Sequence, residues 1–98
     1  MPELEVRCTE PDPVKFALKE VSQVVKYGYP PTGPGPMWEH LRHTGFWVSS
    51  ADDPSSPMPV ETPEAHLVGR RFAAAILWTA YRSGGIGWDP KTGLYFLR

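Results

Sequence analysis

The chain begins with an alternation of apolar and polar positions and continues with apolar positions at helical spacing. In residues 4–9, LEVRCT, every second side chain is apolar, which is the period of a strand with one buried face. Residues 13–27 then place valines, an alanine and a leucine on one stripe of a predicted helix. Asp12 can cap this helix and Gly28 can end it. The stripe must pack on a sheet or on another helix.

A second helical pattern starts at Thr62, which can cap it, and Pro63 suits its first position. In residues 72–81 the pattern is apolar almost all round. We therefore expect this helix to be covered on most sides and to form the centre of the domain. Gly69 costs about 1 kcal/mol relative to Ala in a helix interior, so it indicates a close approach by another backbone or by a large ring. Ser83 and the glycines after it end the helix.

The end of the chain predicts a β-hairpin. In residues 85–98, GIGWDPKTGLYFLR, Asp89 and Pro90 favour a type I turn, and Gly93 suits the left-handed position that follows it. Apolar side chains stand on both sides of the turn, so each strand has a face to bury. The stretch therefore predicts paired strands before it predicts a binding surface.

Together these elements predict an α+β fold in one globular domain, residues 1–98. Residues 4–9, residues 45–50 and the closing hairpin are expected to form one antiparallel sheet of three or four strands, with the two main helices packed on one face. A short helix is predicted after Pro36. An edge strand of such a sheet stays open and could pair with a second copy in a homo-oligomer.

The composition favours a packed domain without a crosslink. Of the 98 residues, 41% are hydrophobic and 12% aromatic, which is unlike a disordered tail. Cys8 is the only cysteine, which excludes an intrachain disulfide and fits a reducing compartment. The first residues lack the pattern of a signal peptide, and the longest apolar run, residues 72–78, is too short to span a bilayer. We therefore expect a cytoplasmic protein without a membrane anchor.

Candidate catalytic and metal-ligating residues do not form a recognisable motif. His40 and His43 lie three positions apart and His66 could join them, but no carboxylate follows at a motif distance, so the metal pattern is weak. Cys8 on a strand predicts a core position rather than a nucleophile. No glycine-rich phosphate loop is present. We therefore expect no enzyme, no bound metal and no cofactor.

Charge is distributed unevenly along the chain, although the formal net charge is −1. Residues 1–65 carry five cations against ten acids, a balance of −5, whereas residues 66–98 carry five cations against one acid, a balance of +4. The basic end predicts, as an alternative function, nucleic-acid binding by the last helix and the hairpin. The cations for that function are Arg70, Arg71, Arg82 and Lys91.

The aromatic residues favour protein binding. Four Trp, four Tyr and four Phe are more rings than a core of this size holds beside its aliphatic stripes, so some are expected on the surface. Rings next to arginines and Pro-rich loops are typical of protein interfaces. We therefore interpret the chain as a non-catalytic protein-binding module: an inhibitor, regulator or accessory subunit. Its predicted contact residues are Tyr27, Tyr29, Trp38, Phe46 and Trp47. Alternatively, Tyr29, Trp38 and Trp47 close one end of the core.

Overall fold

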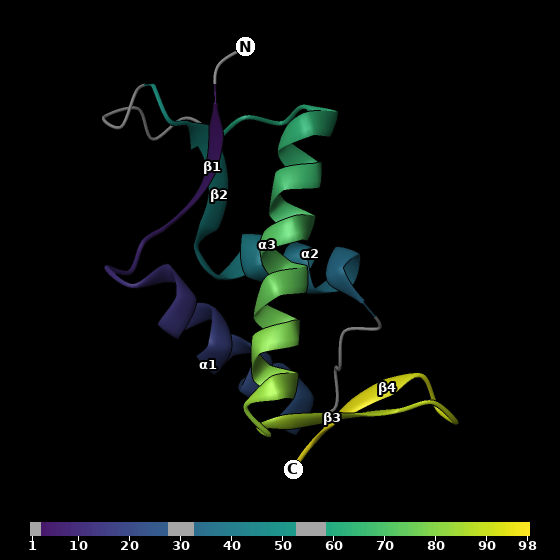
Figure 1. The fold of residues 1–98 in the computed structure, drawn as a ribbon. Coiled ribbons are helices and arrows are strands. Elements are labelled where there is room, and N and C mark those ends of the chain that lie inside the picture. Colours follow the sequence, from purple (N-terminus) through teal and green to yellow (C-terminus); the bar gives the residue numbers. More distant parts are fainter. Residues whose placement is uncertain (1–2, 28–32, 53–58) are drawn as a thin grey trace.

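Three helices and four short strands make up the described part of the chain, residues 3–27, 33–52 and 59–98 of the computed structural model (Figure 1). The α+β class is therefore confirmed. In chain order the elements are β1 (Leu4–Cys8), α1 (Pro13–Lys26), α2 (Pro34–Thr44), β2 (Phe46–Ser50), α3 (Pro63–Arg82), β3 (Ile86–Asp89) and β4 (Leu94–Leu97).

The two long helices begin where their capping residues predict. The Asp12 carboxylate accepts a hydrogen bond from the backbone N–H of Lys15 (3.1 Å), and the Thr62 hydroxyl accepts one from the N–H of Ala65 (3.2 Å). A proline follows each cap, where its missing N–H costs nothing. The shorter helix α2 starts earlier than predicted: the backbone is already helical from Pro34 onward, within a Pro-rich stretch.

Two predicted turns are confirmed by glycines with left-handed backbone. Gly84 has a φ of 83° and follows α3. Gly93 has a φ of 69° in the hairpin turn, where its N–H donates to the carbonyl of Asp89 at 2.8 Å. The hairpin is thus placed directly at the C-terminal end of α3.

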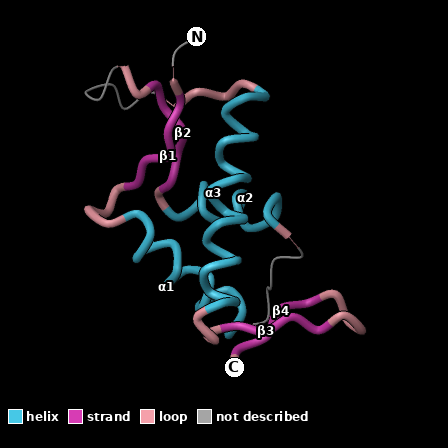
Figure 2. The backbone as a smooth tube through the Cα atoms, viewed as in Figure 1, coloured by secondary structure: helices cyan, strands magenta, loops and turns pink. Residues whose placement is uncertain are grey.

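The strands form two separate antiparallel pairs in the described residues, rather than one sheet. β1 pairs with β2, with Val6 opposite Val48, and β3 pairs with β4, with Trp88 opposite Tyr95. The predicted sheet of three or four strands, with both main helices on one face, is therefore not confirmed. The pairs lie toward opposite ends of α3 (Figure 2), and a helix of that length holds them roughly 20–30 Å apart.

Helix α3 is the element on which the others pack. It contacts α1, α2, both strands of the first pair and β3, and α2 crosses behind it in Figure 1. The central position predicted for it is therefore confirmed. Small residues dominate its buried stripe, which comprises Ala65, Gly69, Ala73, Ile76, Leu77 and Ala80. Side chains this small let neighbouring elements approach the helix closely.

The contact between Gly69 and Trp38 is the tightest example. A Cβ atom on Gly69 would overlap the Trp38 indole ring. Trp38 is only 2% exposed, so the ring has no free space into which it can move. This confirms that the glycine in α3 marks a close approach by a large ring.

We expect Gly69→Ala to lower the free energy of unfolding by about 1–3 kcal/mol, because the added methyl group overpacks the core against the indole. In an uncrowded helix the same change would raise stability by about 1 kcal/mol, so the sign is diagnostic. Urea unfolding measures it. A double-mutant cycle with Trp38→Phe, which shortens the ring, should show positive coupling, and additive effects would contradict the contact.

Candidate functional site

A groove lies between the C-terminal half of α3 and the β3–β4 hairpin, and we call it the aromatic groove. Its volume is about 430 Å³, within the range of sites that bind small ligands or short segments of chain. The residues that matter in its lining are Pro34, Leu77, Trp78, Tyr81, Trp88 and Tyr95. Most of these side chains are aromatic.

Helical and strand periodicity position the four rings. Trp78 and Tyr81 lie three positions apart on α3, so they share a face, and their rings stack with centroids 6.0 Å apart. Trp88 and Tyr95 are directly paired across the hairpin, so they share a face of the sheet, and their rings meet edge to face at 4.6 Å. One wall of the groove is thus helical and the other is a β-ribbon.

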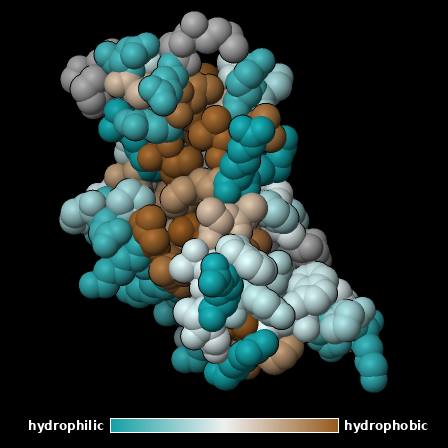
Figure 3. All heavy atoms as spheres, viewed as in Figure 1, coloured by the Kyte–Doolittle hydropathy of each residue, from teal (hydrophilic) through white to brown (hydrophobic). Residues whose placement is uncertain are grey.

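Several of these rings remain accessible to solvent. Trp78 is 59% exposed, and Tyr81 and Trp88 are each 39% exposed. The expectation that residues 72–81 are covered on most sides is therefore wrong for the outer face of α3, because the hairpin leaves this face open. In Figure 3 the most hydrophobic residues form a band beside α3, whereas the surface around the hairpin is coloured more palely. The hairpin also exposes Leu94, Phe96 and Leu97.

Arginines border the aromatic groove. The guanidinium of Arg82 lies over the Trp78 ring at 5.9 Å, and that of Arg98 lies over the Tyr81 ring at 5.5 Å. Arg70 lies against the first turn of α2, which also supplies Pro34 to the groove. None of the cations in residues 66–98 forms an ion pair with an acid in the described part of the chain. The rim of the groove is therefore positive.

Tyr95 adds a neutral polar group to the lining. Burial raises the pKa of the Tyr95 phenol above its ordinary value, because the phenolate would lose hydration there. Near neutral pH the side chain therefore keeps its O–H and can donate a hydrogen bond. The indole N–H of an accessible tryptophan can do the same, so the lining can orient a ligand as well as bury it.

The predicted contact residues are not gathered on one surface. Trp38 is 2% exposed and Phe46 is 3% exposed, so both are core side chains. The ring of Phe46 stacks on Phe16 at 5.4 Å and lies 5.7 Å from Phe72, which joins β2 to α1 and α3. As buried rings they present no area to a partner. For Trp38 the alternative interpretation, that the ring belongs to the core, describes the structure, and Phe46 lies in the core as well.

The other predicted contacts lie apart from one another. Trp47 is half-buried, and its indole nitrogen is enclosed without a hydrogen-bond partner in the described part of the chain. Tyr27 is 65% exposed at the end of α1, where the Lys26 ammonium lies over its ring at 5.6 Å. Tyr29 lies outside the described residues. Trp78 and Tyr81 were not predicted as contact residues because residues 72–81 indicate a helix covered on most sides, and Trp88 and Tyr95 were not because the end of the chain predicts paired strands. The i, i+3 spacing of Trp78 and Tyr81 is the signal that could have found them.

The three histidines lie in different surroundings. Nε2 of His40 lies 3.1 Å from a carboxylate oxygen of Glu20, Nε2 of His66 lies 3.5 Å from one of Glu61, and His43 is exposed. Within residues 3–27, 33–52 and 59–98, no group of three His, Cys, Asp or Glu side chains converges as metal ligands do. His40 and His66 therefore make separate polar contacts with carboxylates.

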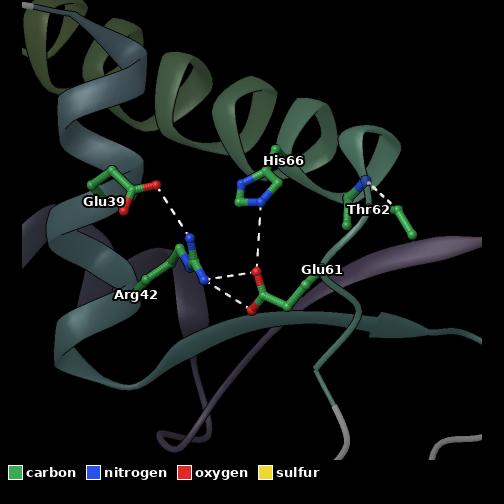
Figure 4. Close-up of polar contacts among 6 residues, drawn as sticks. Glu39, Arg42, Glu61, Thr62 and His66 are labelled. Atoms are coloured by element: carbon green, nitrogen blue, oxygen red, sulfur yellow. Dashed lines mark hydrogen bonds and ion pairs between the residues drawn. The ribbon is translucent and has the colours of Figure 1, made fainter.

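The His66 pair belongs to a polar cluster that holds α2 against the start of α3 (Figure 4). Arg42 donates from one guanidinium nitrogen to both carboxylate oxygens of Glu61, each at 2.8 Å, and from another to Glu39 at 3.3 Å. Glu61 directly precedes the Thr62 cap. The cluster therefore ties the residues that start α3 to the neighbouring helix and plays a structural part.

A second hollow, of about 590 Å³, lies at the start of α1. Carboxylates and ammonium groups are mixed in its lining, which comprises Glu10, Pro11, Asp12, Lys15, Phe16 and Lys19. A single aromatic ring and charges of both signs give it no consistent character. The aromatic groove is therefore the stronger candidate site.

The chain matches no family model, no curated protein and no solved structure. Among the helices of residues 3–27, 33–52 and 59–98, none is long and apolar enough to cross a membrane. Evidence for a function therefore comes from the geometry of the aromatic groove.

Removing the exposed Trp78 ring should barely affect folding, whereas removing the buried Trp38 ring should impair it. We expect Trp38→Ala to cost about 3–5 kcal/mol of unfolding free energy, because it empties a closed part of the core. Trp78→Ala should cost less than about 1 kcal/mol, because most of that ring already faces water. Urea titrations followed by circular dichroism measure both. Comparable losses for the two variants would assign the groove rings to the core.

Proposed function

We propose that this chain is a non-catalytic protein-binding module whose contact surface is the aromatic groove. The observation that carries the proposal is the exposure of Trp78, Tyr81 and Trp88 around one hollow of about 430 Å³. As an inhibitor, regulator or accessory subunit, such a module acts by occupying the surface of a partner.

The residue types around the groove support protein binding. Trp, Tyr and Arg are the side chains that most often carry the energy of protein interfaces. Rigid rings lose little conformational entropy on binding, so the area they bury is used efficiently. Leu97 lies two positions after Tyr95 on β4, hence on the same face of the hairpin, and extends the apolar surface of the groove. An exposed apolar area of this kind marks an interaction site more often than chance exposure.

The lining of the groove supports a non-catalytic role. It contains no carboxylate, thiol or imidazole among the described residues, and these groups perform most acid–base and nucleophilic steps. The phenol of Tyr95 stays protonated because burial raises its pKa, which makes it a hydrogen-bond donor rather than a base. The groove is thus suited to holding a ligand.

Site-specific photo-crosslinking tests the proposal. A benzophenone amino acid in place of Trp78 should give adducts in extracts of cells that express the protein, and the adducts should be sensitive to protease and resistant to nuclease. The same residue in place of Leu67, which is 42% exposed on the first half of α3, is the matched control. It should give markedly fewer adducts.

A third crosslinking position, Tyr27, separates the groove from the surface predicted from the sequence. Stronger adducts from Tyr27 than from Trp78 would move the contact surface to the end of α1. Equal yields from Trp78 and Leu67 would contradict a contact surface in the groove. Adducts between two copies would support self-association, which is predicted through an edge strand.

Nucleic-acid binding is the second candidate function. The observation that favours it is the set of exposed cations without an ion pair in the described part of the chain: Arg70, Arg71, Arg82, Lys91 and Arg98. Exposed rings beside such cations also suit stacked bases. It ranks second because Arg82 and Arg98 already lie over groove rings and the lining between them is apolar.

Salt dependence tests the second candidate. If the basic end binds single-stranded DNA, raising the salt concentration from about 50 to 200 mM should weaken binding by an order of magnitude or more, because counterions are released from the phosphates. Lys91→Ala should weaken it for all base sequences alike and lower the salt slope by about 1. Fluorescence anisotropy of a labelled oligonucleotide measures both. An affinity that does not change with salt concentration would contradict the electrostatic mechanism.

A further inference from the structure

We infer that the aromatic groove recognises a proline-rich segment whose flanking residues are acidic. The inference rests on the proposed function and names the chemistry of the partner at that same site. Three features carry it: the pairing of the rings, the proline already in the lining, and the sign of the charges on the rim.

The rings are arranged as two pairs on facing walls. One pair is stacked on α3, with centroids 6.0 Å apart, and the other meets edge to face on the hairpin at 4.6 Å. Proline-rich segments form an extended helix with about 3.1 Å of rise per residue and present rigid rings that pack between aromatic side chains. Such a segment is already ordered before it binds, so the conformational cost of docking is small.

The groove already incorporates a proline of this chain. Pro34, the first residue of α2, lines the same hollow as Trp78, Tyr81 and Trp88. Its pyrrolidine ring therefore forms part of an aromatic and apolar wall, and a proline from a partner would extend that wall. Pro34 is itself exposed, so part of its ring remains accessible to a partner.

The charges on the rim select the flanks of the segment. Arg82 and Arg98 lie over groove rings and form no ion pair with an acid in residues 3–27, 33–52 or 59–98. Asp89 is the single acid in residues 66–98, against five cations. Carboxylates beside the prolines would meet these arginines, whereas lysines there would be repelled. Complementary charge therefore favours acidic flanks.

Peptide titrations of the full chain test the inference. The probe is a fluorescently labelled hexaproline peptide with glutamates at both ends. It is compared with the same peptide carrying lysines, with a glycine–serine peptide carrying the same glutamates, and with oligothymidylate. At low ionic strength, anisotropy should show at least about tenfold tighter binding of the glutamate-flanked hexaproline than of the other probes.

Single substitutions separate the recognition of proline from the recognition of the acidic flanks. Trp88→Ala should weaken the glutamate-flanked hexaproline about tenfold or more, the loss expected for an aromatic anchor. Arg82→Gln should reduce the preference for glutamate over lysine flanks and leave the preference for proline over glycine–serine in place. Lys15→Gln, an exposed cation on α1, and Leu67→Ala are the matched controls and should change neither preference. Circular dichroism confirms that each variant is folded.

The contrary outcomes are distinct. Equal affinity for glutamate and lysine flanks, or for proline and glycine–serine, would overturn the inference. Binding of oligothymidylate in place of the peptides would overturn it and favour nucleic acid. If no peptide binds while crosslinking from position 78 still captures protein, the ligand chemistry is wrong and the proposed function stands. A Trp78-dependent dimer in sedimentation equilibrium would overturn the inference in favour of a second copy.

Discussion

The indole of Trp38 lying against the bare backbone of Gly69 is the contact on which the rest of the structure depends. A side chain on that glycine would overlap the ring, so α2 can cross α3 at this depth only where α3 has no Cβ. The crossing sets the direction of α2 relative to α3 and therefore the position of its first residue, Pro34. The groove at the far end of α3 is thus partly shaped by a buried contact in the core.

The two halves of α3 have different surroundings because the strand pairs lie at its two ends. Its first half is held by the β1–β2 pair and by the ion pairs of Arg42, Glu61 and His66. Its second half buries Ile76, Leu77 and Ala80 in the core but leaves Trp78 largely in solvent beside the hairpin. Acids pair with cations near the first half, whereas arginines lie over aromatic rings near the second. The uneven distribution of charge along the chain therefore gives the two halves of α3 different surface chemistry.

Much of the fold could be predicted because its signals are local. Asp12 and Thr62 cap helices through hydrogen bonds to residues three positions away, and Gly93 adopts the left-handed backbone of its turn. The number of sheets could not be predicted in this way. Strands at opposite ends of a helix and strands in one sheet have the same alternation of side chains, and the difference lies in contacts between distant segments.

For this protein the sequence by itself determined the elements, the starts of the two long helices and the need for a close neighbour, a backbone or a large ring, beside Gly69. It also determined that the basic charges follow residue 65. The tertiary structure alone decided which tryptophans are buried. Trp38 and Trp78 are the same residue type on amphipathic helices, and one is 2% and the other 59% exposed. Burial depends on whether a remote segment covers the ring, and that energy belongs to the packed chain rather than to any stretch of it.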